Sequence, residues 1–97
     1  YAKHATAAII INENADEGFK ADIITALDKI IPLHDGWKHD LLDNNAAAHL
    51  KSTLLGCEKI IPIKSGSLEL GTWQGIALAE FDGPRERHIL IKISEDK

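Results

Sequence analysis

The sequence is short of several features, and each shortage narrows the class of protein. The 97 residues include no methionine and one cysteine, Cys57. A single cysteine excludes an internal disulfide and is typical of a reducing compartment. No apolar stretch approaches the roughly 20 residues that cross a bilayer, and no signal-peptide pattern opens the chain. We therefore expect a cytoplasmic protein.

Positive charge is also scarce. The formal net charge is −4, and the 11 Lys and Arg residues are scattered along the chain. Nucleic-acid binders usually carry a clustered basic face, so this class is disfavoured. Hydrophobic residues at 44% and charged residues at 27% are ordinary for a globular protein. We expect a single domain over residues 1–97. Because the chain opens on Tyr1 directly before a dense motif, we also expect that an upstream segment is missing.

The first half of the chain predicts one strand and two helices. Residues 5–12 form a short apolar run with three consecutive isoleucines, which favours a buried strand. From Asp16, a plausible N-cap, apolar residues recur every four positions until Pro32 ends the predicted helix. Residues 33–44 are predicted to form a loop with a short strand at 37–41. Asn45 is the expected N-cap of a second helix over residues 46–55.

The second half predicts strands. Residues 58–64 contain Pro62, so an edge strand or a bulge is expected there, followed by a turn and a short strand at 68–70. Residues 72–82 and 87–94 flank a strong turn signal at Asp82-Gly83-Pro84, which predicts a β-hairpin with three isoleucines on one face. The order of these elements predicts an α+β fold. We expect a mostly antiparallel sheet or β-sandwich with two helices packed on it.

Histidine is the residue type most suggestive of a site. Among the five histidines, His4 precedes the first strand, His39 lies in the central loop and His49 lies on the second helix. Neutral imidazole is the commonest ligand of zinc, and three such ligands leave positions open for water or substrate. The spacing is also compatible with surface or hydrogen-bonded residues, because no pair has the separation of a helical metal motif.

Carboxylates and arginines form a second group of candidates. Glu80 and Asp82 share one face of the predicted strand at 72–82, together with Gln74, while Arg85 and Arg87 follow across the turn. Either the carboxylates pair with the arginines, or the two guanidiniums hold a phosphate bidentately. Another carboxylate, Glu13, follows the first strand in the cluster Asn12-Glu13-Asn14, where a turn into the helix cap is the alternative explanation.

Three strings in this order resemble one family. They are His4-Ala5-Thr6-Ala7-Ala8 running to Asn12-Glu13-Asn14, then residues 45–51 (NAAAHLK), then residues 70–75 (LGTWQG) continuing through residues 80–85 (EFDGPR). Together they resemble the YjbQ family of secondary thiamine-phosphate synthases over essentially the whole chain. The resemblance implies a β-sandwich with two helices, an additional N-terminal strand region and assembly as a homotrimer.

The resemblance also implies a site. Its metal ligands match His4, His39 and His49, and zinc is the expected divalent ion. The expected ligand is a phosphorylated small molecule, for which the binding candidates are Arg85, Arg87, Asn12, Gln74 and Asn45. The implied activity joins a pyrimidine diphosphate to a thiazole phosphate and releases pyrophosphate, with Glu13, Glu80 or Asp82 as the acid–base group.

The chain departs from the family pattern at two positions. Ala5 stands where Thr is usual, and Ala47 stands where Asp is usual. The second change removes a carboxylate near His49 that could orient a ligand. A non-catalytic, trimeric metal-binding protein is therefore the alternative function, and it also fits the absence of an evident nucleophile–base pair.

Overall fold

The computed structural model describes residues 1–95 of the chain. The elements follow in the order β1 (Ala7–Glu13), α1 (Glu17–Ile30), a 3₁₀ turn η1 (Lys38–Leu41), α2 (Ala46–Leu55), β2 (Ile63–Lys64), β3 (Ser67–Leu68) and β4 (Gln74–Glu80). The α+β class and the two helices confirm the prediction from sequence. Instead of one larger sheet, the described residues form two sheets of two strands each, β1–β4 and β2–β3.

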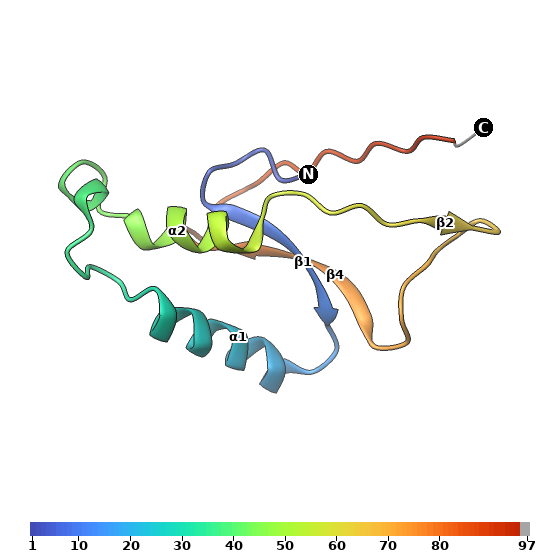
Figure 1. Ribbon diagram of the computed structural model, residues 1–97, viewed down its shortest axis with the longest axis horizontal. Coiled ribbons are helices and arrows are strands. Elements are labelled where there is room, and N and C mark those ends of the chain that lie inside the picture. Colours follow the sequence, from blue (N-terminus) through green and yellow to red (C-terminus); the bar gives the residue numbers. More distant parts are fainter. Residues whose placement is uncertain (96–97) are drawn as a thin grey trace.

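The central sheet pairs β1 with β4, antiparallel, from Ala7 opposite Glu80 to Glu13 opposite Gln74. Figure 1 shows α2 running along β1, while β2 and β3 lie at the tip of an arm that leaves the end of α2. The core is small and dominated by alanine: Ala2, Ala7 and Ile9 form its buried cluster. Small side chains let α2 approach β1 closely, which places the polar residues of α2 beside the sheet.

The two helices begin and end largely as their sequence predicts. Asp16 caps α1, accepting bonds from the amides of Gly18 and Phe19. The range of α2 matches the prediction, and Gly56 ends it with a φ of 89°, a conformation that glycine adopts without strain. Asn45 holds the N-cap position of α2, but its side chain makes no capping bond. The backbone N–H groups of the first turn therefore need hydrogen-bond partners from outside the helix.

The predicted hairpin between residues 72–82 and 87–94 is wrong. Its first strand, β4, pairs with β1, and the later segment makes a single bridge between Ile89 and Ala2. Two backbone hydrogen bonds between Tyr1 and Leu90 join the same segments. The physical reason is that β1 offers β4 a seven-residue partner whose first five residues are apolar, whereas Pro84 has no N–H to continue a ladder with β4.

Two shorter predictions also need correction. The short strand expected at 37–41 is wrong, because residues 38–41 form the 3₁₀ turn η1. The strands expected at 58–64 and 68–70 shrink to the two-residue pair β2 and β3, both exposed. Pro62, directly before β2, has no backbone N–H to donate to β3. Among the described residues no helix covers this two-stranded sheet, so its pairing stays short.

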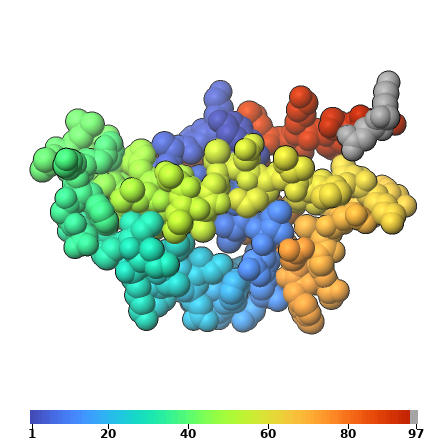
Figure 2. All heavy atoms as spheres, in the orientation of Figure 1, coloured from blue at the N-terminus to red at the C-terminus, as the bar shows by residue number. Residues whose placement is uncertain are grey.

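A cavity of about 600 Å³ separates α1 from the central sheet. Its walls are largely apolar side chains of α1, β1 and β4, including Ile10, Ile23, Leu27 and Ala79. Figure 2 shows α2 and the arm lying across the middle of the molecule in this view, with α1 along the lower edge. None of the histidines predicted as metal ligands lines this cavity, whereas the candidate residues Asn12, Glu13 and Glu80 do.

Candidate metal and phosphate site

His39 and His49 come together from separate elements. The two rings, one on η1 and one on α2, have centroids 4.6 Å apart and meet edge to face at 75°. The Nε2 atom of His39 is buried and has no hydrogen-bond partner. Its nearest carboxylate oxygen, on Asp43, lies 3.7 Å away, which is beyond hydrogen-bonding range. We call His39 and His49 the histidine pair.

The histidine pair fits a metal in part. A buried ring nitrogen without a partner is unusual, because buried polar atoms are nearly always hydrogen-bonded, and its lone pair is a metal ligand. Two imidazoles are nevertheless fewer than the three or four protein ligands of a typical zinc site. Within residues 1–95, no three His, Cys, Asp or Glu side chains are grouped closely enough to hold a metal. The remaining ligands would have to come from water, substrate or another chain.

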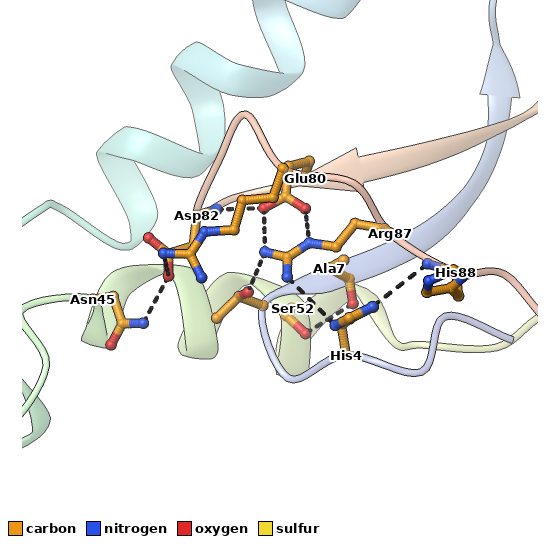
Figure 3. A network of polar contacts seen from close by, with 10 residues as sticks. His4, Ala7, Asn45, Ser52, Glu80, Asp82, Arg87 and His88 are labelled. Atoms are coloured by element: carbon orange, nitrogen blue, oxygen red, sulfur yellow. Dashed lines mark hydrogen bonds and ion pairs between the residues drawn. The ribbon is translucent and has the colours of Figure 1, made fainter.

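His4, the third predicted ligand, has other neighbours in this structure. Its Nδ1 lies 3.4 Å from Nη1 of Arg87, and its Nε2 lies 3.5 Å from the backbone N–H of His88, as Figure 3 shows. Both ring nitrogens thus face donors at long distances. A neutral imidazole has one accepting nitrogen, so it can accept only one of these two bonds. His4 as a metal ligand stays a prediction.

Glu80 and Arg87 form an ion pair that ties the segment after the turn back to β4. The guanidinium meets the carboxylate through two bonds, Nε to Oε2 and Nη2 to Oε1, the latter at 2.8 Å. Nη2 also donates to Oγ1 of the buried Thr6 at 3.0 Å. The side chains are only 8% (Arg87) and 20% (Glu80) exposed. We call Glu80, Arg87 and Thr6 the ionic clamp (Figure 3).

The ionic clamp fixes the charge state of its members. The hydrogen bond from Arg87 lowers the pKa of Glu80 below its ordinary value; partial burial opposes this shift, and the backbone N–H of Asp82 reinforces it. The same bond raises the pKa of Arg87. Glu80 is therefore ionised at neutral pH, and because its pKa is lowered and both of its oxygens bond to Arg87, it is a weak general base. The guanidinium of Arg87 is committed to its partners and is not free for a phosphate.

Arg85, Asp82 and Asn45 are arranged more openly. Arg85 is 62% exposed, and its only ion pair among the described residues is with Asp82, at 3.9 Å. Asp82 accepts a 2.8 Å hydrogen bond from Nδ2 of Asn45, at the start of α2. The Oδ1 atom of Asn45 is buried without a partner. The two arginines look equivalent in the sequence but differ in the structure. The guanidinium of Arg87 is bonded to Glu80 and Thr6, whereas that of Arg85 is exposed.

Three further candidates lie at the opposite end of the sheet. Glu13 pairs with Gln74 and Asn12 with Gly75, whereas Glu80 pairs with Ala7. Because a strand rises about 3.3 Å per residue, the six steps from Ala7 to Glu13 span about 20 Å. Glu13 accepts from the amide of Ala15, and Asn12 accepts from the amide of Glu13. The structure does not bring Asn12, Glu13 or Gln74 to the histidine pair.

Asp40 is a polar residue of this region that the sequence analysis missed. Its Oδ1 accepts a 2.9 Å hydrogen bond from the backbone N–H of Ala46, and its Oδ2 lies 3.3 Å from Nδ1 of His34. The bond from Ala46 is the main reason that the pKa of Asp40 is lowered, and His34 adds to the effect. Little in the sequence indicated this role, because Asp40 lies five residues before the expected N-cap, Asn45, and outside the usual capping position.

Comparison with known proteins decides the family. The sequence profile described as "UPF0047 protein YjbQ-like" matches residues 1–96. A UPF0047 protein of Archaeoglobus fulgidus is 50% identical over 92 residues, which are 95% of this chain and 72% of that protein. The UPF0047 protein MJ1081 of Methanocaldococcus jannaschii is 53% identical over 97 residues, covering 100% of this chain and 69% of that protein. The chain belongs to the YjbQ family.

Solved structures of YjbQ-family proteins have the same fold. A protein of Sulfolobus solfataricus described as YbjQ-like and of unknown function has a TM-score of 0.85 at 45% identity. A protein of Clostridium acetobutylicum from the YjbQ/UPF0047 family has a TM-score of 0.84 at 48% identity. Each match covers 90% of this chain, which spans 62% of the first protein and 66% of the second. Within residues 1–95, no helix is long and apolar enough to cross a membrane.

Proposed function

We propose that the protein binds a divalent metal ion, with zinc the first candidate, through the histidine pair. The observation that carries this proposal is the buried, unpartnered Nε2 of His39 within ring contact of His49. A bound metal would supply Lewis-acid stabilisation of a developing phosphate charge. His4 is a further ligand in the proposal only if it leaves its contacts with Arg87 and His88.

A phosphorylated small molecule is the proposed ligand beside the metal. Asn45 and His49 lie one helical turn apart on α2, where the amide of His49 donates to the carbonyl of Asn45. Through Asn45 the helix reaches Asp82, and Asp82 is the charged neighbour of the exposed Arg85. An arginine with free N–H groups binds phosphate oxygens in pairs. Arg85 is therefore proposed as the phosphate-binding arginine, and Arg87 as its structural counterpart.

The proposed reaction is the thiamine-phosphate synthase reaction that the family resemblance implies. In it the thiazole nitrogen bonds to the pyrimidine methylene carbon while the carbon–oxygen bond to the diphosphate breaks. Among the three predicted acid–base residues, Asp82 is the best placed, because Arg87 lowers the pKa of Glu80 and occupies its oxygens, and Glu13 lies at the far end of the sheet. In this proposal Arg85 neutralises charge on the leaving diphosphate.

Metal content and affinity test the proposal directly. Purified protein is analysed for bound metal and then titrated with Zn²⁺ after treatment with a chelator. We expect His39→Ala and His49→Ala each to abolish stoichiometric binding, while the control His88→Ala, at a histidine of the segment after β4 whose backbone N–H is unchanged by the substitution, keeps it. His4→Ala reports whether His4 joins the site. Wild-type protein that takes up no stoichiometric divalent metal would refute the metal proposal.

The second candidate function is a non-catalytic, metal-binding subunit of a homotrimer. It is favoured by large apolar side chains that this structure leaves exposed, notably Ile60 at 91% and Ile91 at 82%. Sedimentation with and without a chelator separates the two functions. A trimer that dissociates when the metal is removed, without any turnover of the two phosphorylated substrates, supports the second function. A trimer that survives chelation while turnover is lost supports the first.

A further inference from the structure

The position of His39 depends on an irregular segment. Residues 31–45 connect α1 to α2 and contain a single turn of 3₁₀ helix, η1. Apolar packing holds this turn weakly, because Leu41 is 92% exposed and Leu42 is 77% exposed. The hydrogen bond of the Trp37 ring to the carbonyl of Pro32 ties the start of the segment to its own neighbours. A separate tie must therefore set the distance between η1 and α2.

Asp40 supplies such a tie. It lies next to His39 on η1, and its Oδ1 accepts the N–H of Ala46, the first residue of α2, at 2.9 Å. This bond satisfies the N–H of the first helical residue, one of the four N–H groups that have no partner within the helix. The other oxygen of Asp40 faces His34, which lies on the α1 side of the segment. One carboxylate thus connects the loop, η1 and the first turn of α2.

We propose that Asp40 is the positioning residue of the histidine pair: by capping α2 from η1, it holds the ring of His39 against the ring of His49. The metal-binding part of this inference rests on the proposed function, but the geometric part does not. Asp40 touches neither ring through a hydrogen bond within residues 1–95, so its effect passes through the backbone of η1 and α2. Partners that orient ligands in this way commonly change metal affinity by about 10–100-fold.

Four variants test the proposal against the wild type. Asp40→Ala removes the tie. Asp40→Asn keeps a carbonyl oxygen that can accept the Ala46 N–H, so it serves as the conservative rescue. Asp35→Ala is the matched control, because Asp35 is an exposed aspartate of the same loop. Ser52→Ala controls for lost stability alone, because Ser52 joins α2 to β1 through the carbonyl of Ala7 and not through η1.

Two measurements read the variants, both at a temperature where every variant is folded. The first is the nuclear Overhauser effect between the ring protons of His39 and His49 in metal-free protein. We expect it to disappear in Asp40→Ala, to return in Asp40→Asn, and to persist in Asp35→Ala and Ser52→Ala. The second is Zn²⁺ affinity, which we expect to fall at least about tenfold in Asp40→Ala and to recover in Asp40→Asn.

The outcomes separate the two proposals. An Overhauser effect that survives in Asp40→Ala overturns the positioning role, whatever the metal does. An effect that is lost equally in Ser52→Ala also overturns it, because general loosening of α2 would then explain the result. If wild-type protein binds no Zn²⁺, the proposed function fails, yet the Overhauser measurement still decides the role of Asp40. Should Asp40→Ala not fold, Asp40→Asn and Asp40→Ser replace it: a retained effect in the shorter Asp40→Ser overturns the proposal.

Discussion

The ionic clamp and the histidine pair are two polar clusters built in opposite ways. In the clamp, Arg87 and Glu80 are joined by two hydrogen bonds, and their side chains are largely buried. In the histidine pair, one ring nitrogen of His39 is buried with no partner. Removing one partner of such a cluster destabilises a fold, because the other charge is left without its partner. An unpartnered nitrogen carries a desolvation penalty that a ligand can relieve, which is why we assign binding to the histidines.

The two arginines show the same contrast within three residues of chain. Arg87 is 8% exposed and Arg85 is 62% exposed, although each stands near a carboxylate. A committed guanidinium contributes to stability, and a free one contributes to binding. The predictions below separate these two roles, in order of decreasing expected effect on stability.

Breaking the ionic clamp is expected to have the largest effect. Glu80→Ala leaves the guanidinium of Arg87 without its main partner, so we expect the free energy of unfolding to fall by more than in any other variant described below. Chemical denaturation with urea measures the change. The control is Glu69→Ala, at an exposed glutamate without an ion pair in the described residues, which should be close to neutral. Equal effects of the two variants would contradict a structural role for the clamp.

Acid should weaken the clamp in a defined direction. The folded-state pKa of Glu80 lies below its ordinary value of 4.5, so the carboxylate adds stability above pH 4.5 and loses that contribution as the pH falls through its lowered folded pKa. We expect the acid limb of a stability–pH curve to flatten in Glu80→Gln, because the neutral amide no longer titrates. Urea unfolding at a series of pH values that runs from neutral pH down through the lowered pKa of Glu80 checks this. An acid limb identical in both proteins would contradict the assignment.

A hydrogen bond between α2 and the sheet should have an intermediate effect. The hydroxyl of the buried Ser52 donates to the carbonyl of Ala7 at 3.1 Å. Ser52→Ala leaves that carbonyl unsatisfied, so we expect a loss of about 1 kcal/mol in urea unfolding. Thr53→Ala is the matched control, because the hydroxyl of Thr53 bonds within its own helix, to His49, and is exposed. A larger loss in Thr53→Ala than in Ser52→Ala would contradict this account.

The sequence predicted local features better than contacts across the chain. Both helices followed from periodicity and from Asp16, Pro32 and Gly56, which act within one or two turns. The strand partner of β4 was not predicted correctly. Residues 87–94 are next to β4 in the sequence and were therefore expected to pair with it, whereas the actual partner, β1, is distant in the sequence. The difference in burial between Arg85 and Arg87 could not be predicted from the sequence, and neither could the role of Asp40. Both depend on which groups come into contact after folding. The residue types in the sequence were enough to suggest a histidine site. That His39 lies against His49 could be seen only in the structure.

Removing Arg85 should leave stability nearly unchanged and weaken ligand binding. Its ion pair with Asp82 is exposed and long, so we expect Arg85→Ala to alter the free energy of unfolding by less than about 0.5 kcal/mol. Binding of inorganic pyrophosphate, measured by calorimetry on zinc-loaded protein, should fall about tenfold, because a charged hydrogen-bond pair commonly contributes 1.5–3 kcal/mol. Lys92→Ala, at an exposed cation outside this region, serves as the control. If Arg85→Ala costs as much stability as Glu80→Ala, or if pyrophosphate binding is unchanged, the contrast between a free and a committed arginine fails. Because Arg85 is expected to change affinity without changing stability, this variant isolates binding from folding more cleanly than any change in the clamp can.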